Sequence, residues 1–251
     1  SETWILDLAK DNSKPICFLK RQENHLYGIT ENDDCFYVIT NKNNCKNFKL
    51  IKTDLNLVSD LSNWEIVIEH SEESYIEGLE TFKEYFYLEV REDGLPKIKK
   101  IKKDDFSVEY IKFDDPAYSS YLASIGEYSS NEVFYGYSSP NCQSTVFKEN
   151  HKNGKREKVW TQDLKNFDSS LYESERLKIK VRDNKKVPVS FVYKKGIKLK
   201  DSPLLMYGYG SYGAIIDASF KSSILPLLDR GFIFAIAHIL SLIHISEPTR
   251  L

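Results

Sequence analysis

An aromatic tetrapeptide recurs about every fifty residues in the first part of the chain. It reads Phe36-Tyr37-Val38-Ile39, then Phe86-Tyr87-Leu88-Glu89, then Phe134-Tyr135-Gly136-Tyr137, at offsets of 50 and 48 residues. Each copy is followed by a second segment in which charged or polar and apolar residues alternate, and then by a polar turn. A β-rich repeat of this length is typical of the blades of a β-propeller. An ordinary β-sandwich with a chance recurrence is the alternative.

The two segments of each repeat predict two different strand positions. A strand that is apolar on both faces belongs inside a stack of sheets, so the tetrapeptides predict inner strands. The alternating segments carry lysines on one face and predict strands at the outer edge, where charge prevents edge-to-edge association. These alternating segments are residues 48–52, 96–101 and 145–148. Residues 4–8 look like the outer strand of a preceding unit.

The pattern changes after about residue 168. Residues 177–182 and 187–193 predict a hairpin, and residues 203–207 predict a buried strand. A glycine-rich turn follows, then a helix over 218–228 that Asp229-Arg230-Gly231 would end, and then a fully apolar strand over 232–237. Strand, helix and strand in this order are the unit of a parallel α/β sheet. We therefore expect a partial β-propeller over 1–168 and an α/β domain that begins at 169.

Composition excludes several classes of protein. The 35 Lys and Arg residues nearly balance the 37 Asp and Glu residues, which argues against a nucleic-acid-binding protein. The cysteines Cys17, Cys35, Cys45 and Cys142 lack metal-ligand spacing, so no metal site is expected. The longest apolar run is too short to span a membrane, and the first residues do not resemble a secretory signal. We expect a cytoplasmic protein that has no membrane partner.

The turn Tyr207-Gly208-Tyr209-Gly210-Ser211-Tyr212-Gly213 is the densest motif. Its glycines fit the G-x-G-x-x-G pattern of dinucleotide sites, but the next strand ends at Ala237-His238 and lacks the acidic residue that would hold a ribose. Ser211 fails the G-x-S-x-G pattern of a nucleophile elbow, because Tyr209 stands two residues before it. None of the five histidines has a recognisable nucleophile partner, and a tight, aromatic-packed loop remains a structural alternative.

Around these residues the chain resembles the prolyl oligopeptidase family of serine peptidases, and within it the oligopeptidase B branch. The resemblance rests on residues 203–213 together with Leu228-Asp229-Arg230-Gly231-Phe232, and on 113–118 and 135–139, and it extends from 1 to 239. It implies that 1–168 are the last blades of a propeller and that 169–239 open an α/β-hydrolase domain. It also implies a cofactor-free enzyme that cleaves short peptides after Lys or Arg with a Ser-Asp-His triad.

The resemblance carries three residues over as site residues. Tyr209 would donate its hydroxyl to the transition-state oxyanion, Tyr212 would contribute to substrate binding, and Asp217 would help to read basic substrate residues. A second acidic position of the family is occupied here by Ser219. Asp217 also has a purely structural interpretation, as an acidic residue at the N-terminus of a helix.

The nucleophile, the Asp and the His of the family have no counterpart in this chain, which is expected to be inactive alone. After Ile239 the family pattern stops, and residues 240–251 look like a translated sequencing adapter, so we exclude them, with His244 and Ser246, as an assembly artefact. Two other functions stay open. A nucleotide-binding oxidoreductase would use the glycine turn, and a non-enzymatic propeller would be a binding module.

Overall fold

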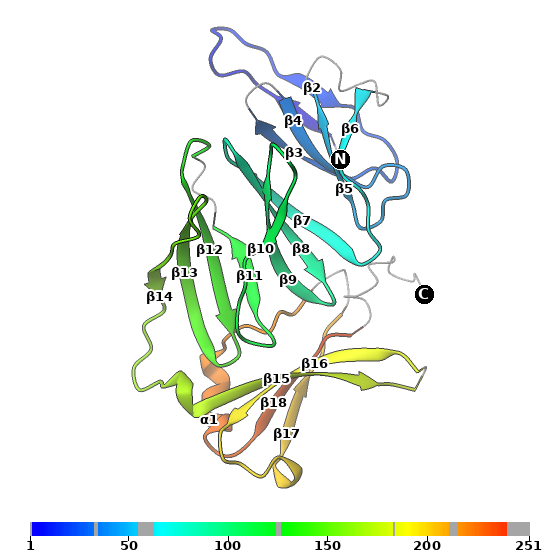
Figure 1. Ribbon diagram of the computed structural model, residues 1–251. Coiled ribbons are helices and arrows are strands. Elements are labelled where there is room, and N and C mark those ends of the chain that lie inside the picture. The colour runs from blue at the N-terminus through cyan, green and yellow to red at the C-terminus, as the bar shows by residue number, and fades with distance from the viewer. Residues whose placement is uncertain are drawn as a thin grey trace.

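The computed structural model describes residues 2–32, 35–54, 63–123, 127–182, 184–210 and 215–239, and most of its regular structure is β (Figure 1). Three four-stranded antiparallel sheets follow one another along the chain, each with its strands in sequence order. Figure 1 shows them as an open array of successive sheets, which is the arrangement of propeller blades.

The strands of these three sheets have the following bounds. The first sheet contains β3 (Tyr27–Asn32), β4 (Cys35–Thr40), β5 (Lys49–Thr53) and β6 (Glu65–Ile68). The second contains β7 (Ser74–Thr81), β8 (Tyr85–Glu92), β9 (Leu95–Lys102) and β10 (Val108–Tyr110). The third contains β11 (Ser119–Leu122), β12 (Glu132–Ser139), β13 (Cys142–Asn150) and β14 (Arg156–Thr161). A separate two-stranded sheet joins β1 (Thr3–Ile5) to β2 (Ile16–Leu19).

The aromatic tetrapeptides lie on β4, β8 and β12, each the second strand of its sheet, so their predicted inner position is confirmed. Alternation along β8 sends neighbouring side chains to opposite sheets. Phe86 packs with Tyr37 of the first sheet, at 5.5 Å between ring centroids, whereas Tyr87 packs with Tyr135 of the third. The aromatic strand of the second sheet therefore forms the contact to both of its neighbours.

The third repeat is out of phase by one residue. The 48-residue offset equates Phe134 with Phe86, but Val133 and Tyr135 are the buried residues that face the second sheet. Because side chains alternate with a period of two, a slip of one residue exchanges the two faces of the strand. The recurrence of residue types located the strand, but it does not fix which of its residues face the second sheet.

The predicted outer position of the alternating strands is wrong. β5, β9 and β13 are third strands, and β6, β10 and β14 lie outside them. On β9 the isoleucines Ile98 and Ile101 are buried. Lys97, Lys99 and Lys100 instead form ion pairs with acidic residues of the neighbouring strands β8 and β10. Lys100, for example, lies 3.3 Å from a carboxylate oxygen of Glu109 on β10. Ion pairing within the sheet makes a lysine-rich strand compatible with a position one strand in from the edge.

A fourth sheet is mixed, with the order β15-β16-β18-β17. The predicted hairpin is confirmed as β15 (Tyr172–Lys180) and β16 (Lys186–Lys194). β17 (Leu204–Tyr207) and β18 (Ile233–Ala237) are parallel, as expected. β18 is buried, but β17 is exposed along its whole length. The prediction of a buried β17 is wrong because, among the described residues, this strand pairs only with β18 and forms the edge of the sheet.

The predicted helix is shorter than its apolar spacing indicated. A 3-10 turn, η5 (Ser222–Ile224), leads into α1 (Leu225–Leu228), and the residues from Ala218 to Lys221 are not helical. Their backbone is engaged elsewhere, since the amide of Phe220 donates to Ser138 Oγ on β12 at 2.9 Å. After α1 the chain turns at Gly231, whose φ of +85° suits glycine. Two further 3-10 turns are η3 (Ser169–Leu171) and η4 (Leu199–Asp201).

A buried histidine links the second and third sheets. His151, in the turn after β13, is 4% exposed and accepts or donates at both ring nitrogens. Its Nδ1 lies 3.0 Å from the Tyr87 hydroxyl and its Nε2 lies 3.1 Å from the carbonyl oxygen of Ser130. The consistent tautomer carries its proton on Nε2, so that Tyr87 donates to Nδ1. Burial lowers the pKa of His151, which keeps the ring neutral.

We predict that Tyr87→Phe lowers the free energy of unfolding by about 1–3 kcal/mol, because it leaves Nδ1 of His151 buried without its partner. Chemical denaturation measures the change. Tyr121→Phe is the control, since Tyr121 is 52% exposed and should change stability by about 0.5 kcal/mol or less. Equal effects of the two substitutions would contradict the assigned role of the Tyr87 hydroxyl.

Candidate functional site

The glycine turn leaves the carboxyl end of β17 at one edge of the mixed sheet. Gly208 passes close to β18, where a Cβ at this position would lie 3.8 Å from Ala237. Tyr209 follows and is 41% exposed, and no described residue hydrogen-bonds its hydroxyl. A phenol hydroxyl that has no hydrogen-bond partner among the described residues can donate a hydrogen bond to a ligand. Ser211 and Tyr212 lie outside the described residues.

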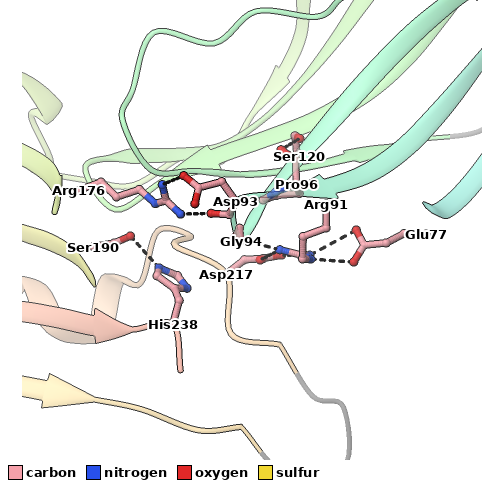
Figure 2. A network of polar contacts seen from close by, with 10 residues as sticks. All are labelled: Glu77, Arg91, Asp93, Gly94, Pro96, Ser120, Arg176, Ser190, Asp217 and His238. Carbon is pink, nitrogen blue, oxygen red and sulfur yellow. Dashed lines mark hydrogen bonds and ion pairs between the residues drawn. The ribbon is translucent and has the colours of Figure 1, made fainter. Parts of the chain in front are cut away.

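Asp217 lies in the segment between the glycine turn and η5, and its carboxylate is held by Arg91 from β8 (Figure 2). Arg91 Nη1 donates to Asp217 Oδ1 at 2.7 Å, and Nη2 donates to Oδ2 at 3.4 Å. The opposite side of the same guanidinium contacts Glu77 of β7, with Nε donating to Oε1 at 2.8 Å. One arginine thus joins two carboxylates that come from distant parts of the chain.

The Arg91 side chain is only 7% exposed, whereas Glu77 and Asp217 are each about a quarter exposed. Burial works against the charge of Arg91, but Asp217 and Glu77 hold its pKa above the ordinary value. The cluster of one cation and two anions keeps a net charge of −1, because Glu77 and Asp217 outnumber Arg91. The expected role of Asp217 as a helix N-terminal acid does not describe its contacts, since η5 begins only at Ser222.

A second contact joins the same blade to the mixed sheet. Asp93 and Gly94, both with positive φ, form the tight turn between β8 and β9. Asp93 accepts from Arg176 Nη1 at 3.1 Å and from Lys178 Nζ at 2.9 Å, both on β15. Burial raises the pKa of Asp93, but these two cations outweigh it and lower the pKa overall.

The structure also brings together a serine and a histidine that the sequence did not pair. His238 follows β18 and its Nε2 lies 2.7 Å from Ser190 Oγ on β16. Both residues are almost completely buried, at 1% and 2% exposure. Burial, reinforced by Arg176 nearby, lowers the pKa of His238 to about 4. A neutral imidazole with no access to solvent supports the packing of the sheet and is not placed to activate a nucleophile for substrate.

Comparison with known proteins decides the family. The family model described as "Prolyl oligopeptidase, N-terminal beta-propeller domain" matches residues 1–162. The chain belongs to the prolyl oligopeptidase family. Members of this family are serine peptidases, and the three sheets β3–β14 lie within the matched range.

This prolyl oligopeptidase chain is similar to two curated relatives and to one solved structure along most of its length. It is 34% identical to "Dipeptidyl aminopeptidase BI" of Pseudoxanthomonas mexicana over 82% of the chain and 28% of that protein. It is 32% identical to "Protease 2" of Moraxella lacunata over 95% of the chain and 34% of that protein. Oligopeptidase B from Leishmania major superposes with a TM-score of 0.87 at 27% identity, over 97% of this chain and 37% of that one. The chain therefore spans about a third of the length of these relatives.

The nucleotide-binding alternative finds no support in the geometry of this prolyl oligopeptidase chain. β17 and β18 are parallel, so Gly208 and His238 both follow the carboxyl ends of these strands. Asp229 precedes β18 and therefore lies at the amino ends of the strands. Asp229 is moreover engaged by the Tyr172 hydroxyl at 3.0 Å and by Lys194 Nζ at 2.8 Å. An acidic residue in this position cannot hold a ribose beside the glycine turn.

The described residues contain no cluster of three His, Cys, Asp or Glu side chains that could hold a metal ion. In the same ranges, no helix has the length and apolarity needed to cross a membrane. The four cysteines are free thiols. Residues 240–251, with His244 and Ser246, lie outside the described residues, so the interpretation of this segment stays a prediction.

We predict that stability falls as the pH drops from about 6.5 towards 4, in part because of His238. The unfolded chain takes up this proton near pH 6.5 and the folded chain only near 4, so between these values acid favours unfolding. The full contribution is on the order of 3 kcal/mol. Denaturation at several pH values measures it, and His238→Gln should flatten the dependence in this range. A His238→Gln profile as steep as the wild type would contradict the assignment.

Proposed function

We propose that the chain is part of a serine oligopeptidase that cleaves short peptides on the carboxyl side of Lys or Arg. In this proposal β15–β18 are the opening of an α/β-hydrolase domain, and the nucleophile, the base and its acidic partner belong to other parts of the longer protein. The similarity to peptidases over almost the whole chain supports the reaction class. The chain covers only about a third of these relatives, which leaves room for the rest of the catalytic domain.

The observation that carries the proposal is the position of Tyr209. In open α/β sheets, ligands bind beyond the carboxyl ends of the parallel strands. Tyr209 lies just beyond the carboxyl end of β17, at the side of the sheet where the parallel strand β18 also ends, and its ring is exposed. A hydroxyl there, without a partner in the part of the chain that the structure describes, is suited to a substrate carbonyl oxygen that becomes negatively charged as the acyl bond is attacked.

The chemistry assigned to the chain's own residues is limited to two roles. Serine attack on a peptide carbonyl forms a tetrahedral intermediate, which collapses to an acyl-enzyme and a free amine, and water then releases the acid. Tyr209 donates a hydrogen bond to the oxyanion in both halves of this reaction. Asp217 accepts a hydrogen bond from a basic substrate side chain, since two nitrogens of Arg91 do not exhaust the acceptor sites of a carboxylate. Tyr212 remains a proposed contributor to substrate binding.

We predict that Tyr209→Phe in the full-length protein lowers kcat on the order of 10²- to 10³-fold, while KM for an arginyl amide changes little, because only the transition state carries the oxyanion. Tyr207→Phe is a matched control, because Tyr207 is equally exposed on β17 and faces Lys221 with its ring. Steady-state kinetics and thermal denaturation are measured together. An unchanged kcat with a lower thermal midpoint would show that Tyr209 is structural.

We also predict that the 251-residue chain alone does not hydrolyse arginyl or lysyl amides above background. Its described hydroxyl–imidazole pairs, such as Ser190 with His238, are buried, and a serine needs an accessible general base to attack. A fluorogenic amide assay on the purified chain tests this. Turnover that is lost on Ser211→Ala would place the nucleophile within the glycine turn and refute the division of roles proposed above.

A further inference from the structure

Arg91 is the only described residue whose side chain hydrogen-bonds the carboxylate of Asp217. The two residues are 126 positions apart in the sequence, and they come from the second blade and from the segment after the glycine turn. Among the described residues, no other hydrogen bond fixes the rotamer of Asp217. The direction in which this carboxylate points is thus decided by the blade.

Glu77 gives Arg91 a fixed orientation in turn. It accepts from Nε at 2.8 Å and from Nη2 at 3.4 Å, which holds the guanidinium along one side. The planar group then presents its Nη1 end to Asp217, and Nη1 also approaches the carbonyl oxygen of Gly94 at 3.5 Å. A lysine has a single nitrogen and cannot hold two carboxylates in this planar geometry.

Stability alone does not account for such an arrangement. Taking a guanidinium out of water costs several kcal/mol, and buried ion pairs are often no better than apolar residues of the same volume. The blade already contacts the mixed sheet through Asp93, Arg176 and Lys178. The contact between Arg91 and Asp217 adds a defined position for the Asp217 carboxylate, which is still about a quarter exposed to solvent.

We infer that Arg91 is a positioning residue for substrate specificity: it orients Asp217, from the propeller side, to accept a hydrogen bond from a basic substrate side chain. Ser219, two residues after Asp217, carries no charge, so in this proposal recognition depends on one carboxylate and on how well that carboxylate is oriented. The inference rests on the proposed function, in which Asp217 contacts the substrate. It adds that the propeller blade sets the geometry of this contact.

The experiment compares arginyl peptides with the same peptides in which each arginine in turn is replaced by citrulline, a neutral side chain of the same shape. The ratio of kcat/KM for arginine over citrulline measures recognition of the charge. Asp217→Asn in the full-length protein identifies the peptide position that Asp217 contacts, because the ratio falls at that position. At that position Arg91→Lys is expected to lower the ratio roughly 10- to 100-fold, chiefly through KM, because misplacement of a binding group has effects of this size. The double variant should lose no more than Asp217→Asn alone.

Arg176→Lys is the matched control. Arg176 is a similarly buried arginine at the same contact between blade and mixed sheet, but its partner is Asp93 and not Asp217. It is expected to lower the thermal midpoint and to leave the arginine-to-citrulline ratio unchanged. A purely structural role for Arg91 predicts the same behaviour for Arg91→Lys, so a ratio equal to that of the wild type would overturn the inference.

The remaining outcomes are also decisive. A higher ratio in Arg91→Lys would mean that Arg91 competes with the substrate for Asp217, which overturns the inference. If the wild-type protein cleaves arginyl peptides but Asp217→Asn leaves the ratio unchanged, Asp217 does not read the substrate and Arg91 has nothing to position. If the wild-type protein does not distinguish arginine from citrulline at all, the proposed Lys/Arg specificity itself fails.

Discussion

The aromatic strand β8 is buried on both faces, and the site depends on this constraint. Phe86 on one face and Tyr87 on the other fill the contacts to the preceding and following sheets. A strand fixed in this way has little freedom at its end, where Arg91 lies and the turn to β9 begins. Side-chain alternation in one strand therefore holds a charged group at a defined place between the blade and the mixed sheet.

Two ionic contacts, made by Asp93 and by Arg91, join the second blade to the mixed sheet in different ways. Asp93 accepts from two cations of β15 and ties the turn to the mixed sheet. Arg91, in contrast, is itself the buried charge, and it leaves both of its carboxylate partners partly exposed. Breaking such a buried pair by removing one partner is much more harmful than replacing the pair as a whole, because the remaining charge stays desolvated. The geometry of Asp217 is consequently coupled to the integrity of the second blade.

The sequence predicted the strands that hydrophobic pattern alone specifies. The three aromatic strands, the β15–β16 hairpin and the parallel pair β17 and β18 were all located from local pattern, because strands of these kinds carry their burial in their composition. Positions that depend on neighbours were missed. β17 is apolar but exposed at a sheet edge, the lysine-rich β9 is covered by β10, and the start of α1 is displaced by a hydrogen bond from Phe220 to Ser138. Within the site, Tyr209 and Asp217 came from family resemblance, whereas Arg91, Glu77 and the Ser190–His238 pair involve long-range contacts that no local pattern encodes.

We propose above all that the tyrosine after β17 stabilises the oxyanion of a serine peptidase reaction. The most direct measurement is a crystal structure of the full-length protein inactivated by an arginyl phosphonate, whose phosphonyl oxygen takes the place of the oxyanion. We expect the Tyr209 hydroxyl within about 2.6–3.0 Å of that oxygen, with Asp217 still held by Arg91. A phosphonyl oxygen bound by other donors, with the Tyr209 ring turned away from it, would contradict the account.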